Sequence, residues 1–490
     1  MSVASLSSRT RGDAADAEPA CPSPRGSVGP REISQLDRAR VDHGRVDHGR
    51  ALDAFGPLAG VSGYDLQVPL IDGRSVRYAN LDYAASAPAL DAVIEDQQRV
   101  LPYYASVHRG AGYASAVSTA LYEQARQTVA EFVGARSEDL TIFTRNTTDA
   151  LNLLADAVPA EVGVVCLDIE HHANLLPWQG LQATIVPASA TLAATLDDLD
   201  RVLAETGAGL LAITGASNVT GEVLPLRRLA DLAHRHGARL AVDGAQLVPH
   251  RRINIAESGV DYLAFSGHKI YAPFGTGVLI GRADWLDAAD PYLAGGGAVR
   301  KVTVEHTDWA TGEARHEGGT PNVLGAAALA SACRAIDEIG DDHLRRHEWR
   351  LRTRLLSRLA ALPQVRVLAI WPDCTDAVGV VGFTIAGYDA GLVAAYLSAE
   401  HGIGVRDGAF CAHPLAARLD IAGGALRASF GLGSGSEDVD RLLAALRSLI
   451  NNGPRWAYEI VDGRYQPVGD ARPRPSWLST LDTAPNPCQA

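Results

Sequence analysis

Two lysines stand out in this chain because almost every other basic residue is arginine. Of the 44 Lys and Arg residues in 490, only Lys269 and Lys301 are lysine. A guanidinium stays protonated at any workable pH, so arginine can supply charge but cannot act as a neutral nucleophilic amine. A lysine kept in such a background is a candidate for amine chemistry, in particular a Schiff base to a carbonyl cofactor.

The sequence around each lysine distinguishes the two. Lys269 ends the segment 266–269 (SGHK), which directly follows the apolar run Tyr262–Phe265. Lys301 follows a triple glycine and an arginine, and we interpret it as a surface charge. The alternative is that Lys269 was retained by chance. Residues elsewhere in the chain are needed to distinguish a catalytic lysine from this alternative.

Lys269 and the other candidate residues follow short apolar strands that alternate with helices. This alternation is typical of a largely parallel sheet covered by helices on both faces. Ligands of such sheets bind at the carboxyl ends of the strands. We expect strands at 140–144, 162–167, 210–214, 239–242 and 262–265, and helices at 149–158 and 226–234.

Hydroxyl residues mark one candidate phosphate site. Thr147 and Thr148 lie between a predicted strand and the next helix, where backbone N–H groups and the helix dipole attract an anion. Plain helix capping is the alternative. Ser266 and His268 flank Lys269 and could donate to the same phosphate.

Asp243 directly follows the strand Leu240–Val242. A carboxylate at the end of a buried strand is costly unless it meets a cation or a metal. A protonated pyridine nitrogen would serve, and the carboxylate would keep that ring an electron sink. Gln246 could reach a ring substituent. A metal ligand or a cap is the alternative, but no second carboxylate lies nearby in the sequence.

Two further motifs contain side chains that could contact a cofactor or a substrate. His171 and His172 are adjacent, and adjacent side chains rarely converge on one metal ion, so an imidazole lying on a flat aromatic cofactor fits better. Arg427 comes from the later part of the chain. It could bind a substrate carboxylate with two parallel hydrogen bonds, or it could be a surface charge.

Composition excludes several function classes. The formal net charge of −13 disfavours nucleic acid and anionic membranes as partners. No apolar run approaches the roughly 18 residues of a membrane helix, and the N-terminus lacks a secretory signal, so we expect a cytoplasmic protein. The six scattered cysteines form no CxxC pair, which argues against a disulfide framework and a metal site. Of these, Cys166 and Cys333 read as core residues.

The chain divides into four predicted segments. Residues 1–60 read as a disordered N-terminal tail with a tandem repeat at 41–50, and 61–335 as a large cofactor-binding domain. Residues 336–452 form a smaller domain bounded by charged helices at 341–362 and 437–450. Residues 453–490 are a C-terminal extension, with a β-hairpin around Asp462-Gly463 and then a Pro-rich tail.

Eight short motifs keep a common order and spacing over about residues 60–450, and they lie at 80–86, 107–110, 146–152, 170–179, 217–221, 242–246, 266–269 and 319–322. This set resembles the class V branch of the pyridoxal 5'-phosphate (PLP) aminotransferase superfamily, fold type I. It is most similar to the cysteine desulfurase and selenocysteine lyase members. The resemblance implies an α/β fold, in which a large domain with a mostly parallel sheet flanked by helices carries a smaller α/β C-terminal domain.

The resemblance also implies roles around the cofactor ring. Lys269 would form the internal aldimine, and Asp243 would pair with the pyridine nitrogen. His171 would stack on the ring and count among the catalytic residues. Asn218 and Gln246 would lie near the phenolic oxygen.

Further roles concern the phosphate and the substrate. Thr320 matches a residue that reaches the phosphate of the neighbouring subunit, which implies a homodimer. Arg427, Asn218 and His108 would bind the amino-acid substrate. Within one subunit the phosphate would be held by Thr147, Thr148, Ser266 and His268.

Cys411 occupies the position of the persulfide-forming cysteine in these relatives. The match departs there, because Ala409 and Phe410 precede the cysteine where such relatives commonly carry histidines. Apolar neighbours do not help a thiol to ionise, so His413 or the substrate itself would have to supply the base.

The leading hypothesis is cleavage of the C–S or C–Se bond of cysteine or a related amino acid. Lys269 would remove the Cα proton, and Cys411 would take the sulfur and pass it to an acceptor, which could be a protein. One alternative is another class V reaction, by an aminotransferase or a C–S β-lyase, with Cys411 not catalytic. The other is a non-catalytic scaffold, which loss of Lys269, Asp243 or Arg427 would favour, yet all three are present.

Overall fold

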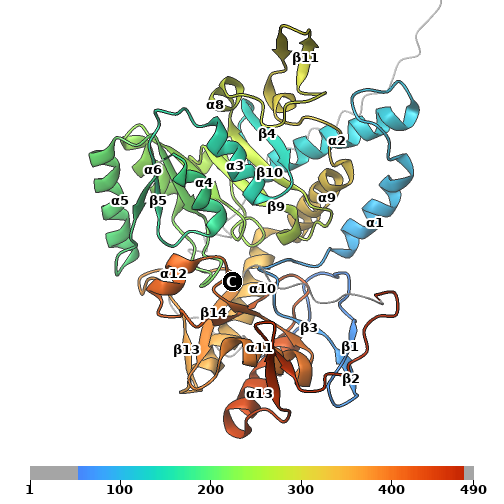
Figure 1. Cartoon of the computed structure of the whole chain (residues 1–490), viewed down its shortest axis with the longest axis vertical. Coiled ribbons are helices and arrows are strands. Elements are labelled where there is room, and N and C mark those ends of the chain that lie inside the picture. The colour runs from blue at the N-terminus through green and yellow to red at the C-terminus, as the bar shows by residue number, and fades with distance from the viewer. Residues whose placement is uncertain (1–52, 182, 479–490) are drawn as a thin grey trace, which may run out of the picture. The chain divides into compact units, whose positions relative to one another are not determined.

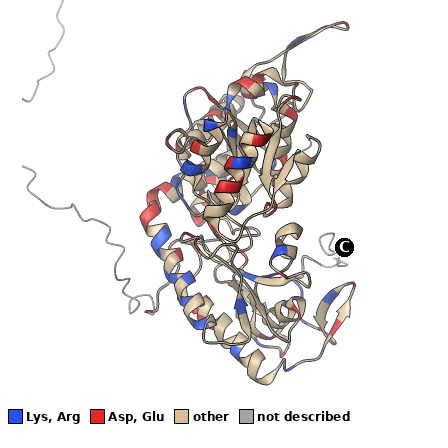
Figure 2. Cartoon of the chain, turned by 90° about the vertical axis from the view of Figure 1, so that its left-hand side faces the viewer, with Lys and Arg blue, Asp and Glu red and all other residues tan. Residues whose placement is uncertain are grey.

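The computed structural model describes residues 53–181 and 183–478, which form a larger and a smaller domain (Figure 1). Acidic and basic residues are both spread over this part of the chain (Figure 2). Within these residues, no helix has the length and apolar character required to cross a bilayer.

A seven-stranded sheet forms the centre of the large domain. Its strand order is β4-β10-β9-β8-β7-β5-β6, and only β10 runs antiparallel to the other strands. The largely parallel sheet predicted from the sequence is therefore confirmed. The strands are β4 (Asp139–Thr144), β5 (Val164–Leu167), β6 (Thr184–Val186), β7 (Leu210–Thr214), β8 (Arg239–Asp243), β9 (Tyr262–Ser266) and β10 (Gly277–Arg282).

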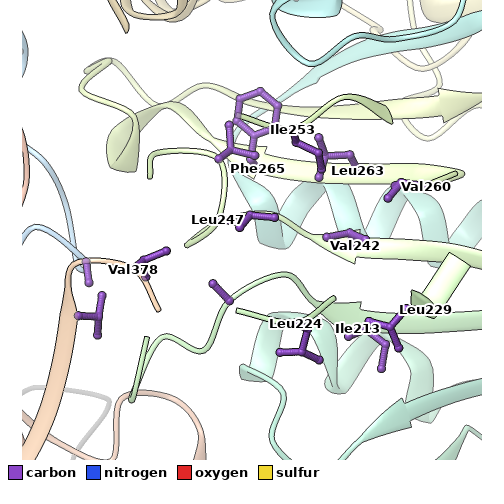
Figure 3. Packing of buried hydrophobic residues seen from close by; sticks show 14 of the residues in the cluster. Ile213, Leu224, Leu229, Val242, Leu247, Ile253, Val260, Leu263, Phe265 and Val378 are labelled. Carbon is purple, nitrogen blue, oxygen red and sulfur yellow. The ribbon is translucent and has the colours of Figure 1, made fainter. Parts of the chain in front are cut away.

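Helices cover both faces of this sheet. Successive strand residues point to opposite sides, so both faces carry apolar side chains that the helices bury. Leu210 and Ala212 of β7 pack in one core, whereas Leu211 and Ile213 pack in the other. Figure 3 shows Ile213 in this second core, with Val242 and Leu263 of the neighbouring strands. The helices of the large domain are α1 (Asp91–Val100), α2 (Tyr113–Phe132), α3 (Thr147–Ala157), α4 (Leu176–Gln179), α5 (Leu192–Thr206), α6 (Leu226–Arg235), α7 (Ile255–Ser258), α8 (Ala283–Ala288) and α9 (Val323–Ile339).

The element boundaries differ from the predicted ones by a few residues. Helix α3 begins at Thr147, two residues before the predicted start, because Asn146 caps it by accepting a hydrogen bond from the Asp149 backbone N–H. Cys166 and Cys333 are buried as predicted. Lys301 is exposed, in a hairpin formed by β11 (Val299–Val302) and β12 (Thr307–Trp309).

The small domain is an antiparallel sheet with three long helices. Its strand order is β13-β14-β17-β16, and its core is formed by apolar residues of this sheet and these helices. This agrees with the predicted smaller α/β domain. Its elements are α10 (Asp341–Leu359), β13 (Val365–Val367), β14 (Val380–Ile385), α11 (Ala390–His401), β15 (Ile403–Gly404), β16 (Arg406–Gly408), α12 (His413–Arg418), β17 (Ala425–Ser429) and α13 (Ser436–Asn452).

The first strands of the described residues also belong to the small domain. The hairpin of β1 (Gln67–Pro69) and β2 (Ser75–Arg77) is followed by β3 (Ala79–Asn80), which pairs in parallel with β15. Leu81 is buried in the small-domain core. These residues lie within the predicted large domain at 61–335, and a local apolar pattern could not identify their distant partner.

Residues between 53 and 60, which fall within the predicted tail, contact the small domain. The Phe55 backbone N–H donates to Ser436 Oγ at 2.9 Å, and the Leu58 N–H donates to the Leu432 carbonyl at 2.7 Å. Residues 1–52, with the tandem repeat and Cys21, lie outside the described residues, as do 479–490 with Cys488.

The predicted C-terminal hairpin is confirmed. Strands β18 (Tyr458–Val461) and β19 (Arg464–Pro467) pair in antiparallel fashion. Asp462 and Gly463 between them have φ values of 49° and 76°, as a two-residue hairpin turn requires. Strand β19 lies against α11 of the small domain (Figure 1).

Candidate active site

A cavity of about 360 Å³ lies at the carboxyl ends of the central strands, between the two domains. Strands β8 and β9 end at its wall, and the small domain contributes one residue of β16, the turn after β16 and one residue of β17. The cavity brings together eleven residues that the sequence singled out: Thr147, Thr148, His171, Asn218, Asp243, Gln246, Ser266, His268, Lys269, Cys411 and Arg427.

Lys269 lies in a short 3₁₀ turn directly after β9, η4 (Gly267–Lys269). Burial lowers the pKa of its amine to about 8, with Arg427 acting in the same direction and Asp243 opposing. A substantial fraction of the amine is therefore neutral near pH 8, which is what nucleophilic or base chemistry needs.

Asp243 ends β8 and is 3% exposed. Its Oδ1 accepts a hydrogen bond from the Ala245 backbone N–H at 2.9 Å. Burial raises the pKa of this carboxyl, and Lys269 opposes that shift. Within the described residues, no basic nitrogen lies within 4 Å of the carboxylate. A cation inside the cavity, such as a protonated ring nitrogen, would therefore stabilise it.

Like Asp243, Gln246 has a buried polar atom that a bound cofactor could pair. Its Nε2 donates to the Ala84 carbonyl at 2.7 Å, whereas its Oε1 is buried with no hydrogen-bond partner among the described residues. Buried polar atoms are usually paired, so an unpaired one on a cavity wall fits a polar ligand there. The donor set of this cavity suits PLP.

The N-terminus of α3 forms the predicted phosphate end of the cavity. The Thr147 N–H donates to Ser266 Oγ at 2.7 Å, and the two hydroxyl oxygens lie 2.6 Å apart. Because Asn146 is the cap, neither threonine is needed for capping, and the exposed Thr148 lines the cavity. His268 also lines it, and burial lowers its pKa to about 4, so the ring is neutral.

His171 presents a neutral imidazole to the cavity. Its Nδ1 accepts the Ala173 backbone N–H at 3.0 Å, so the proton of the neutral ring lies on Nε2. Burial lowers its pKa to about 3, with Lys269 contributing.

Glu170, next to His171, is a residue to which the sequence gave no role. It is fully buried, and burial raises its pKa to about 8. Its Oε2 accepts from Asn174 Nδ2 at 2.7 Å, and Asn174 Oδ1 accepts from Trp178 Nε1 at 3.1 Å. This chain of hydrogen bonds fixes the turn from which the imidazole projects.

Arg427 of β17 is 4% exposed, so it is not a surface charge. It donates to the Asn218 carbonyl at 2.9 Å and to Asp82 Oδ1 at 3.1 Å. Burial lowers the pKa of its guanidinium, and Asp82 opposes that effect. Its Nε is buried without a partner among the described residues, so a donor remains for a ligand.

Cys411 lies in the turn between β16 and α12, with its side chain on the cavity wall. Phe410 and Cys411 have φ values of 56° and 54°, a left-handed conformation that residues other than glycine rarely adopt. Cys411 interacts electrostatically with Lys269 and with Arg427.

Two large-domain residues hold this turn against the cavity. Asn218 Nδ2 donates to the Phe410 carbonyl at 2.8 Å, and the His172 N–H donates to the Cys411 carbonyl at 2.9 Å. The His413 N–H donates to His172 Nε2 at 3.4 Å, and the two rings lie 4.6 Å apart. These contacts offset the cost of the left-handed backbone.

Two predicted residues lie outside this cavity in the single chain. Thr320 is exposed and lines another cavity beside Tyr292. His108 is exposed and bonds to Glu123 Oε1 at 2.9 Å. The predicted contact of Thr320 with the phosphate of the neighbouring subunit and the predicted binding of the substrate by His108 stay predictions.

Arg406 is a cavity residue that the sequence reasoning missed. It lies opposite Arg427 across the β16–β17 pair and lines the same cavity. The only signal in the sequence was its position five residues before Cys411.

The sequence profile of the family Aminotransferase class-V matches residues 79–442. The chain belongs to this family. Its members are PLP enzymes of fold type I, so the chain is a PLP-dependent enzyme by family, in agreement with the resemblance noted in the sequence.

Individual relatives carry a more specific name. The chain is 36% identical to a cysteine desulfurase of Klebsiella pneumoniae (strain 342) over 392 residues, which cover 77% of this chain and 94% of the relative. It is 37% identical to a probable cysteine desulfurase of Halalkalibacterium halodurans over 390 residues, with coverage of 77% and 93%. An apo cysteine desulfurase structure from Thermococcus onnurineus NA1 superposes with a TM-score of 0.71, at 33% identity and coverage of 76% and 94%.

Proposed function

We propose that this protein is a PLP-dependent cysteine desulfurase, which takes sulfur or selenium from cysteine or a closely related amino acid and leaves alanine. The observation that carries the proposal is the presence of Cys411 in one cavity with Lys269, Asp243 and Arg427. The names of the relatives support it.

The residues of the cavity suit the parts of PLP. Asp243 would hold the ring nitrogen, His171 would cover the ring face, and the N-terminus of α3 with Ser266 and His268 would hold the phosphate. When bound, PLP supplies a carbonyl for an amine and an electron sink for the electrons of a broken Cα–H bond.

Arg427 would orient the substrate. Its guanidinium binds the α-carboxylate through the donors that Asp82 and the Asn218 carbonyl leave free, and Nε is one of them. Because Asp82 and Asn218 fix the guanidinium, the substrate Cα is presented toward Lys269.

Lys269 would move the proton. Its neutral amine accepts the Cα proton at Nζ, and the resulting ammonium returns a proton to Cβ after sulfur has left. A pKa near 8 suits both directions at neutral pH, since a base and its conjugate acid are then both populated.

Cys411 would take the sulfur. Its thiolate attacks the substrate Sγ, a S–S bond forms, and the C–S bond breaks. The electron pair of that bond stays on Cβ, where protonation completes the methyl group of alanine. The enzyme then carries a persulfide, which a thiol acceptor must remove.

Replacement of Cys411 tests this function. Cys411→Ala should reduce alanine release from cysteine by about 100-fold, because the sulfur loses its nucleophile. Cys374→Ala is the matched control, since Cys374 is half-buried elsewhere, with its Sγ at the Asp376 carbonyl, and this variant should keep wild-type turnover. Unchanged turnover of Cys411→Ala would exclude the persulfide route.

The alternative is another class V reaction with Cys411 not catalytic. The observation in its favour is the burial of Phe410 beside Arg427, with the ring 5.3 Å from the guanidinium, in a turn that Asn218 and His172 hold in place. Product identity separates the reactions: alanine with persulfide for a desulfurase, pyruvate with ammonia for a β-lyase, and a keto acid for an aminotransferase.

The assembly also belongs to this proposal. We infer a cytoplasmic homodimer in which Thr320 and His108 complete the site of the neighbouring subunit. Their exposure and their separation from the cavity of their own chain support this arrangement.

A further inference from the structure

A second concave site, larger than the Lys269 cavity, lies on the small domain. This groove has a volume of about 790 Å³, within the range of roughly 300–1,000 Å³ that small-molecule sites occupy. Its walls are the start of α11, strand β16, the loop 422–424 and the C-terminal hairpin.

The hairpin that closes the groove lies beyond residues 79–442, the segment matched by the family. It is fixed against α11 at Gly391, where an added Cβ would lie 3.2 Å from the Tyr465 ring. Arg464 and Ile460 then face the groove. The hairpin therefore builds one wall of the groove.

The groove presents two cationic side chains and one anionic side chain without ion-pair partners. Within the described residues, no carboxylate lies within 4 Å of the guanidinium of Arg406 or Arg464, and no basic nitrogen lies that close to Asp407. Burial raises the pKa of Asp407, and the charge of Arg406 partly opposes that shift. Asp389 is engaged, because it caps α11 by accepting from the Gly391 and Leu392 N–H groups.

The groove adjoins the turn that carries Cys411. Ala409 and His413, two residues before and after the cysteine, line the groove, whereas Cys411 itself lines the inner cavity. A molecule in the groove therefore lies beside the turn that carries Cys411, and Arg406 lines both cavities.

We propose that this groove binds a small peptide thiol, with two carboxylates and one ammonium group, as the acceptor of the Cys411 persulfide. Arg406 and Arg464 bind the carboxylates, and Asp407 binds the ammonium group. This inference rests on the proposed function for the transfer step, but the binding site does not depend on it.

The transfer balances without any oxidant or reductant. The thiolate of the peptide attacks the outer sulfur of the persulfide, and a new S–S bond forms on the peptide. The S–S bond to Cys411 breaks and its electron pair leaves with the cysteine as a thiolate. The peptide departs as a persulfide, and Cys411 is ready for the next substrate.

Calorimetric titration of the PLP-loaded protein with S-methylglutathione tests the site without any turnover. This probe keeps the charges of glutathione but has no thiol. Arg464→Gln should weaken its binding about tenfold, because one charge-assisted hydrogen bond is lost. Arg447→Gln removes the same charge from an exposed position on α13 and should bind as the wild type does. No binding to the wild type, or equal binding by both variants, would overturn the proposal.

Acceptor kinetics then test the transfer. With glutathione as acceptor, Arg464→Gln should raise the KM for the thiol about tenfold, whereas with 2-mercaptoethanol the rate of alanine formation should be unchanged. If Arg464→Gln impaired the reaction equally with both thiols, recognition of the peptide's charges by the groove would be contradicted. If alanine never forms but S-methylglutathione still binds, the proposed function fails and the binding site stands.

Discussion

At the residue scale, the chemistry depends on the burial of ionisable side chains that would be fully charged in water. Lys269 and Asp243 come from adjacent strand ends, and burial shifts the pKa of each toward its neutral form. Each charge partly offsets the shift of the other. The cavity therefore holds a reactive amine and a carboxyl that gains from a cationic ligand.

The pKa of Lys269 leads to a pH prediction. Burial lowers it from 10.5 to about 8, so in the cofactor-free protein the amine is neutral above pH 8 and protonated below it. About one tenth is neutral at pH 7. Acylation of Lys269, followed by peptide mass spectrometry, should rise with pH and level off above about pH 9. Lys301 in the same digest is the internal reference, and labelling of Lys269 that still climbs at pH 10 would contradict the assignment.

The sequence was informative for residues that follow strands. Asp243 and Lys269 could be predicted because the ends of parallel strands meet at one edge of a sheet, whatever the rest of the fold does. Arg406 and the contact of His172 with the Cys411 turn could not. Both depend on contacts between segments of different domains, and no local sequence pattern predicts which segments will be in contact.

At the element scale, helix α3 and strand β9 form one unit around the end of the cavity that we propose binds the phosphate. Ser266, the last residue of β9, accepts from the first N–H of α3 and pairs with the Thr147 hydroxyl. The sequence predicted both elements but placed the start of the helix two residues late, because two threonines were read as possible caps while Asn146 does the capping.

Loss of the Ser266 hydroxyl should weaken cofactor binding. In Ser266→Ala the N-terminus of α3 loses a fixed contact and the cavity loses a donor, so the PLP dissociation constant should rise about tenfold. Titration of the cofactor-free protein, followed by near-visible absorbance, measures it. Ser331→Ala, which removes a hydroxyl that donates to Asp96 far from the cavity, should leave the affinity unchanged. Equal affinity of the two variants would remove Ser266 from the site.

At the scale of the whole molecule, both domains contribute to one cavity, so their relative position determines its geometry. A buried network fixes that position, in which Glu348 of α10 bonds His250 Nδ1 and, at 3.1 Å, Arg251 Nη1 of the large domain. Charges buried this deeply are stable only when paired, so the network resists separation of the domains. The sequence predicted two domains, but no local pattern indicated that residues 67–81 would pack with the second.

The central claim is that this cavity holds PLP on Lys269. The purified protein, reduced with borohydride after loading with PLP and then digested, should carry a phosphopyridoxyl group on the peptide of Lys269 and none on that of Lys301. The chain has only these two lysines, so the result is unambiguous. A phosphopyridoxyl group on Lys301, or on neither lysine, would contradict the account.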